Sequence, residues 1–134
     1  MAVKQSVNAL WRVTPLILGV ILLVGIMQVF LPSNVIGSLF HHSLIFDSFI
    51  GSAIGSILVG NPITSYVIGG ELLIQGVSLT AVTAFIVAWV TVGIVQFPAE
   101  AVMLGRRFSI LRNGLSFFFS ILVAVITVLL FRFL

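Results

Sequence analysis

The sequence predicts an all-α integral membrane protein, and three observations lead to this fold class. The chain of 134 residues is 60% hydrophobic and 7% charged, whereas soluble globular proteins contain roughly 25% charged residues. Its mean hydropathy is +1.34. Two apolar runs, residues 13–31 and 115–134, have the length of about 20 residues that a helix needs to cross a bilayer. No linker divides residues 1–134, so we expect one transmembrane domain.

The first predicted span, residues 13–31, follows the cations Lys4 and Arg12. Its apolar stretch is longer than the roughly 7–15-residue core of a signal peptide, and no small-residue cleavage site follows, so we expect a retained span. Lys and Arg collect on the cytoplasmic side of a span. The N-terminus is therefore predicted to lie inside, in a multi-pass protein of the cytoplasmic (inner) membrane. Gly19 and Gly25 fall on different faces, which predicts a lipid-facing helix.

The middle of the chain is broken at Asn61-Pro62. Proline has no N–H to donate and pushes the preceding residue out of the α region. The break separates two apolar arms, residues 43–60 and 62–78. At ~1.5 Å per residue both arms are shorter than the ~30 Å hydrocarbon core. The sequence therefore predicts a helical hairpin, and the short arms favour a re-entrant hairpin over two short spans.

The C-terminal half completes the predicted architecture of three full transmembrane helices plus the hairpin. We expect full spans over residues 79–97 and 115–134, and a short interfacial helix over residues 98–104, where a proline and an acid in the first turn suit a helix start. A hairpin in the middle returns the following basic loop to the cytoplasm, as the positive-inside rule requires. The three arginines of that loop, Arg106, Arg107 and Arg112, are expected to set topology and to contact anionic lipid headgroups. Glu100 is expected to pair with Arg107.

Small and weakly polar residues recur on one face of four predicted elements. Gly51-x-x-x-Gly55 predicts close helix packing, and Ser52 and Ser56 lie beside these glycines. Such faces predict tight packing, and together with an intramembrane acid they also predict a polar interior. The other faces consist of Thr64, Glu71, Gln75 and Ser78, of Thr80, Ala84, Ala88 and Thr91, and of Ser116, Ser120, Ala124 and Thr127.

The residues of the hairpin are the candidates for a substrate or ion pathway. A charge at the depth of Glu71 costs at least ~2.5 kcal/mol on insertion scales, so we predict charge compensation or proton coupling there. The alternative is a carboxylate that reaches the headgroups or pairs with a partner's cation. Around the break, Asn61, Pro62, Thr64 and Ser65 are predicted to contact a ligand at the start of a half-helix, or Asn61 merely caps that helix.

A second titratable group consists of Asp47 with His41 and His42. Histidine changes charge near neutral pH, which suits a proton relay, but the spacing matches no metal motif, and solvation at the membrane surface is favoured. The chain contains no cysteine, so it lacks a disulfide, a thiolate metal site and a thiol nucleophile. No enzyme motif is present and no cofactor is expected. The few cations form no basic face for nucleic acid.

Three segments carry a resemblance to a known family: GSILVGNPITSYVIGGELL (55–73), AFIVAWVTVGIVQFPAEAVMLGRRF (84–108) and LRNGLSF (111–117). They resemble the predicted-permease family that includes the organoarsenical efflux permeases. The resemblance implies a permease for a small solute or ion. Full-length members are roughly twice this size and internally repeated, so this chain would be a half-size transporter that forms a homodimer. The absence of the cysteine found in members that handle trivalent arsenic argues against arsenic as substrate.

Three functions fit these residues. The leading hypothesis is a homodimeric permease subunit with its site near the hairpin. The alternatives are a non-transporting membrane assembly or anchoring subunit, whose small-residue faces serve packing alone, and a small channel. Substituting Glu71→Gln separates the first two, because transport should fail while assembly persists in a permease.

Overall fold

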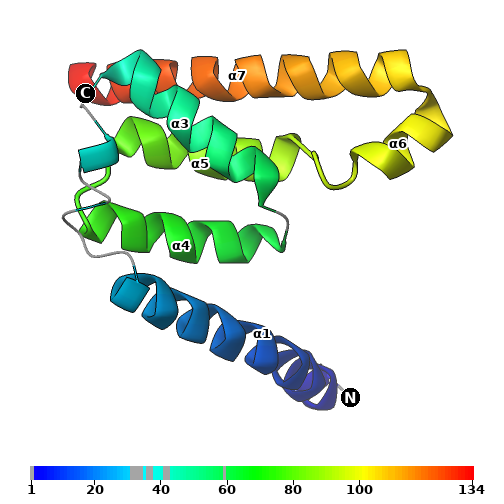
Figure 1. Cartoon of the computed structure of the whole chain (residues 1–134). Coiled ribbons are helices and arrows are strands. Elements are labelled where there is room, and N and C mark those ends of the chain that lie inside the picture. Colours follow the sequence, from blue (N-terminus) through cyan, green and yellow to red (C-terminus); the bar gives the residue numbers. More distant parts are fainter. Residues whose placement is uncertain (1, 31–34, 36–37, 41–42, 59) are drawn as a thin grey trace.

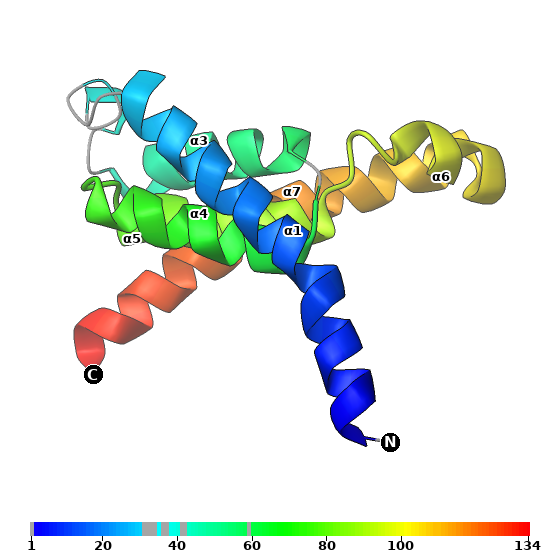
Figure 2. The same ribbon diagram turned by 90° about the horizontal axis from the view of Figure 1, so that it is seen from below.

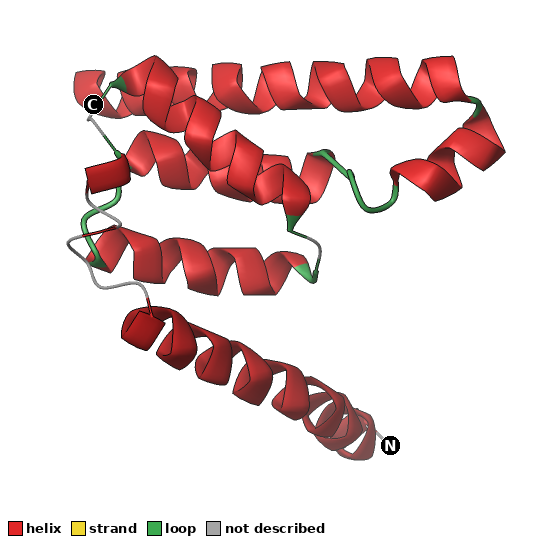
Figure 3. Cartoon of the chain, viewed as in Figure 1, coloured by secondary structure: helices red, strands yellow, loops and turns green. Residues whose placement is uncertain are grey.

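The computed structural model describes the chain except for residues 1, 31–34, 36–37, 41–42 and 59. Figure 3 shows helices joined by short loops, and the described residues contain no strand. The predicted all-α fold class is thus confirmed. The helices are α1 (Ala2–Phe30), α3 (Leu44–Ile57), α4 (Pro62–Ile74), α5 (Leu79–Thr91), α6 (Phe97–Leu104) and α7 (Arg106–Phe133).

The helices form layers, with α1 and α7 on opposite sides of α4, α3 and α5 (Figures 1 and 2). Helix α1 packs on α4, α4 packs on α5, and α7 packs across both α3 and α5. Successive helices α3, α4 and α5 reverse direction at each connection, so that α3 and α5 run parallel to each other. The N-terminus and the start of α7 lie at one end of the layers, and the C-terminus lies at the other (Figure 1).

Helices α3 and α5 approach until their backbones touch. A Cβ atom added to Gly51 would lie 2.1 Å from the carbonyl oxygen of Ala81, and one added to Gly55 would lie 2.3 Å from that of Phe85. Only glycine leaves room for a backbone this close. The two contacts advance by four residues on each helix, which is the repeat of one helical face. The structure therefore places Gly51-x-x-x-Gly55 at the centre of the closest helix contact described.

Small and polar side chains take many of the buried positions, beside a small apolar core that includes Ile68, Val82 and Phe85. Many large apolar side chains face outward instead, whereas a water-soluble protein buries most of its Leu, Ile, Val and Phe. The largest fully buried side chains are those of Asp47, Ser48, Ser52, Ser65, Ser109 and Ser120. Exposed large apolar residues occur on every described helix and include Ile45, Phe49, Ile63, Ile74, Val90, Val102, Phe118 and Phe131.

Most of the buried serine hydroxyl groups donate to a carbonyl oxygen of their own helix. Ser48, Ser56 and Ser65 donate to the carbonyl oxygens three residues earlier, at distances of 2.7–2.9 Å. Ser120 donates in the same way to Phe117 at 2.7 Å, and its oxygen lies 2.8 Å from that of Ser52. Because the Ser120 proton is already used, Ser52 is the donor in that pair. The small-residue faces of α3, α5 and α7 thus serve helix packing.

One helix of the described residues, α7, is long and apolar enough to cross a membrane. Helices α3, α4 and α5 are apolar but have only 13 or 14 residues. The full span predicted over residues 79–97 is therefore wrong, because α5 ends at Thr91 and Val92 is extended. The basic loop predicted before residue 115 is also wrong, since α7 begins at Arg106, directly after Gly105 with φ 91°.

Two other segments that were predicted to be helical are helices in the structure. A helix over residues 98–104 was predicted, and α6 covers Phe97–Leu104 with Gly105 at its C-cap. Residues 13–30 of the first predicted span lie within α1, which ends at Phe30, and residue 31 lies outside the described residues. The described apolar side chains of α1 are exposed, among them Leu18, Ile21, Leu22, Ile26 and Val29.

Candidate functional site

Two interruptions of the helical backbone meet at one end of the structure. The first separates α3 from α4 at residues 58–61, and the second separates α5 from α6 at residues 92–96. They border a cavity of about 100 Å³, named here the break cavity. Its lining comes from both interruptions, from the end of α5 and from α7: Gly60, Pro62, Trp89, Val90, Thr91, Val92, Gly93, Gln96 and Arg112.

The first interruption is capped by Asn61. Its side-chain oxygen accepts the N–H of Ile63 at 2.9 Å, and its backbone carbonyl accepts the N–H of Thr64 at 2.9 Å. Pro62 occupies the first turn of α4, where its missing N–H is harmless. Asn61 therefore caps α4 and occupies these two N–H groups. This capping is compatible with ligand contact at the break, which stays a prediction.

Trp89 joins the first interruption to α5. Its indole Nε1 donates to the carbonyl oxygen of Gly60 at 3.3 Å. A Cβ atom added to Gly60 would lie 3.1 Å from the indole ring. The ring also packs edge-on against Phe85, with centroids 5.4 Å apart. Trp89 thus satisfies a carbonyl group that the broken helix leaves without its usual partner.

The second interruption is held by Asn113 of α7. The Asn113 side-chain oxygen accepts the N–H of Gly93 at 2.9 Å. Its amide nitrogen donates to Glu100 Oε2 at 3.1 Å and to the Ser109 carbonyl at 3.0 Å. One side chain therefore joins the loop after α5, helix α6 and helix α7. This contact replaces the helical hydrogen bonds that α5 would need to continue past Thr91.

Arg112 supplies the charge at the break cavity. Its Nη1 forms an ion pair with Glu100 Oε1, and the two side chains are 39% and 17% exposed. The expectation that Glu100 pairs with Arg107 is thus wrong. Helix α7 begins early enough to place Arg112 opposite α6, two turns after its start. A guanidinium has five N–H donors, so Arg112 can hold Glu100 and still present donors to an anionic or carbonyl-containing solute.

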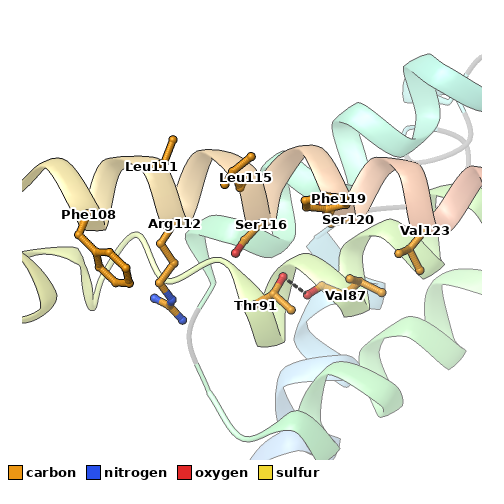
Figure 4. A pocket seen from close by; sticks show the side chains of 10 residues that line it. All are labelled: Val87, Thr91, Phe108, Leu111, Arg112, Leu115, Ser116, Phe119, Ser120 and Val123. Carbon is orange, nitrogen blue, oxygen red and sulfur yellow. Dashed lines mark hydrogen bonds between the residues drawn. The ribbon is translucent and has the colours of Figure 1, made fainter. Parts of the chain in front are cut away.

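A larger, apolar groove continues from Arg112 along α7. It has a volume of about 460 Å³ and lies between α5 and α7. Figure 4 shows Phe108, Arg112, Ser116 and Val123 of α7 directed toward the side on which Thr91 lies. The Thr91 hydroxyl donates to the Val87 carbonyl at 2.7 Å, so the polar group on α5 is already satisfied. This groove suits an apolar occupant.

The residues predicted for a substrate or ion pathway do not come together in the structure, because they lie toward opposite ends of the short helices. Asn61 and Pro62 lie at the break, whereas Asp47 near the start of α3, and Glu71 and Gln75 near the end of α4, lie toward the opposite end. The Gln75 amide donates to Glu71 Oε1 at 3.2 Å. The remaining predicted residues do not line the break cavity: Thr64 and Ser65 are buried on α4, Gly51, Ser52, Gly55 and Ser56 are buried on α3, and Arg106 and Arg107 are exposed on α7.

Asp47 is buried, which corrects the expectation that it is solvated at a membrane surface. Its side chain is 1% exposed. The two histidines predicted to accompany it, His41 and His42, lie outside the described residues. Among those described, no group of three or more metal-ligating His, Cys, Asp or Glu residues occurs.

Several residues that line or support the break cavity were not identified from the sequence. Trp89, Gly93 and Gln96 lie inside the segment predicted as a continuous span, and Asn113 lies in the predicted loop. Gly93 and Gln96 near the end of an apolar run are a signal for an early helix end. Asn113 gives no local signal, because its partners are 13 and 20 residues away.

The chain matches no family model, no curated protein and no solved structure in the comparisons made. The resemblance of residues 55–117 to a permease family stays a prediction.

Proposed function

We propose that the protein is a multi-pass protein of the cytoplasmic membrane. The outward placement of large apolar side chains and the burial of serine and glycine support this proposal. Lipid cannot solvate polar groups, so side chains such as Ser48 and Ser56 must be satisfied inside the protein, as they are. Helix α7 has a membrane-crossing length. The three short helices, each about 20 Å long at ~1.5 Å per residue, fit inside the hydrocarbon core of ~30 Å.

The arrangement of the chain suits an N-terminus in the cytoplasm. Lys4, at the start of α1, shares one end of the layers with Arg106 and Arg107, at the start of α7, whereas Arg132 lies near the C-terminus at the other end (Figure 1). Five cations on one side and one on the other agree with the positive-inside rule. The break cavity then opens toward the cytoplasmic half of the membrane.

Within the membrane, the protein is proposed to act as a permease subunit for a small polar solute or ion. The observation that carries this proposal is the meeting of two broken helices around the break cavity, with Arg112 in its wall. Irregular backbone at membrane depth persists where protein covers it or where it lines a wet cavity, and secondary transporters use such breaks to bind substrate. Arg112 favours a solute with an anionic or carbonyl group.

The subunit is further proposed to work as a homodimer. Transport sites commonly lie between two structural repeats, and a half-size chain provides one. The apolar groove between α5 and α7 can take a helix of a second copy. Single cysteines at Leu115 or Phe119, which line the groove, should then form crosslinked dimers on oxidation, whereas a cysteine at the exposed Val102 of α6 should not.

Cysteine labelling tests the transport proposal, because the chain has no cysteine of its own. Gln96→Cys and Thr91→Cys place thiols at the break cavity, and Ile54→Cys and Ile63→Cys are matched controls on outward-facing apolar surfaces. In membrane vesicles, a water-soluble maleimide should label the cavity positions at least tenfold faster than the controls. Equal, slow labelling at both sets would show that no water reaches the cavity, which contradicts transport through it.

The alternative function is a non-transporting assembly subunit. The hydrogen bond between the Ser52 and Ser120 side chains favours it, since these hydroxyl groups are then used for packing within the chain. An assembly subunit predicts slow labelling at Gln96 together with normal assembly of the protein.

A further inference from the structure

Asp47 lies where α3 packs against the start of α5. The close contacts pair Gly51 with Ala81 and Gly55 with Phe85, so one turn earlier Asp47 falls beside the residues that begin α5. Ser78 caps this end by accepting the Ala81 N–H at 3.3 Å. Figure 1 shows this end of α3 at the opposite end from the start of α4 and the end of α5, whose residues line the break cavity. Asp47 is therefore a separate feature of the molecule.

The carboxylate of Asp47 is buried, and none of the described residues donates a hydrogen bond to it. Its side chain is 1% exposed, and within the described part of the chain neither Oδ1 nor Oδ2 has a hydrogen-bond donor. An ionised carboxylate in this position is strongly unfavourable unless a cation or donors compensate it. The neighbouring hydroxyl does not compensate it, because Ser48 donates to the Ile45 carbonyl at 2.9 Å.

The helices packed against α3 offer no compensating charge at this place. They are α5 and α7. Helix α5 contains no titratable residue from Leu79 to Thr91. Helix α7 carries arginines in its first two turns, near the break cavity, and then only Arg132, whose side chain is exposed in the last turn.

We propose that Asp47 binds a monovalent cation, either a proton or an alkali-metal ion, while α3 is packed against α5. The bound cation neutralises the carboxylate in the packed arrangement. Its loss leaves a bare negative charge in a contact made of backbone and small side chains, which favours separation of α3 from α5. The binding site stands on the geometry of Asp47 alone, and only its use as a coupling site for transport rests on the proposed function.

Thermal unfolding of the purified protein in lipid nanodiscs tests this site. The midpoint Tm is measured at constant ionic strength in choline, sodium or potassium chloride, and in choline over a pH series. For the wild type we expect Tm to rise on the order of 5 °C with sodium or potassium, or on lowering the pH, because a ligand that binds only the folded state stabilises it. Asp47→Asn, which is neutral and of similar size, should lose this response.

Ser48→Ala is the matched control, because it alters the adjacent buried position and leaves the carboxylate. It should keep the wild-type response. If Asp47→Asn does not accumulate, Asp47→Ser replaces it. A response to sodium or potassium identifies an alkali-metal ion, and a response to pH alone identifies a proton. A wild-type Tm that is unchanged by all three treatments overturns the proposal, as does a response that survives in the Asp47 variant. Maleimide labelling of Gln96→Cys is independent of these measurements, so the transport proposal can fail while the cation site stands.

Discussion

Substituting Gly51→Ala should destabilise the protein, because the contact between α3 and α5 has no room for a methyl group. The added Cβ atom would lie 2.1 Å from the Ala81 carbonyl oxygen, whereas ordinary contact begins at 3.4 Å. The contacted atom belongs to a helix backbone and cannot rotate away. Helix α3 must therefore move by more than 1 Å, or α5 must bend.

The expected loss is about 2 kcal/mol in the free energy of unfolding. Overpacking in a rigid contact costs about 1–3 kcal/mol, and a gap of ~0.5–1 Å opened along the rest of the interface forfeits a quarter to a half of the dispersion energy there. Alanine has a higher helix propensity than glycine, which offsets up to about 1 kcal/mol of this loss. For a chain of 134 residues this net loss lowers Tm by about 5–10 °C.

Unfolding in detergent, followed by size-exclusion chromatography after heating, measures this difference. Gly114→Ala is the matched control, because Gly114 lies within α7 and no atom comes within 4 Å of its added Cβ. That variant should be as stable as the wild type or slightly more stable. If Gly51→Ala and Gly114→Ala unfold at the same temperature, α3 and α5 do not touch through Gly51 and the packing argument is refuted.

Three further outcomes follow from the hydrogen bonds. Ser52→Ala and Ser120→Ala should each lower stability by about 1 kcal/mol, with a coupling energy of ~0.6 kcal/mol in a double-mutant cycle of thermal unfolding. Asn61→Ala should cost about 1 kcal/mol through loss of the α4 cap, and Asn61→Ser should restore most of it. Asn113→Ala leaves the Gly93 N–H without its acceptor, so amide hydrogen exchange at Gly93 should become at least tenfold faster while exchange in α3 stays unchanged.

Local chemistry predicts the first helix break but not the second. Pro62 lacks the N–H that a continuous helix would need at this place, and it begins α4 after the break. Helix α5 ends at Thr91 without a proline. Its end depends on Asn113, which takes the Gly93 N–H from 20 residues away. Hydropathy cannot register that contact, so the apolar run continues past the true helix end.

The burial of Asp47 could not be predicted from the sequence either. Neighbouring histidines and a position at the start of an apolar arm suggest a solvated surface. Burial arises because Gly51 and Gly55 allow α3 to lie against the backbone of α5, and this close approach carries the preceding turn into the same interface. The glycine spacing therefore predicts a close contact of this helix with another. Whether Asp47 is buried depends on which helix is contacted and on where that helix begins.

The two proposed sites lie at opposite ends of one short helix. Asp47 is in the first turn of α3, and the chain leaves the last turn toward Gly60 and the break cavity. Between them, Gly51 and Gly55 contact α5 through backbone atoms. A cation that favours the packed position of α3 would thereby also favour one arrangement of the break. Helix α3 can couple the two sites by moving as a rigid body relative to α5, whose start lies beside Asp47 and whose Trp89 contacts Gly60.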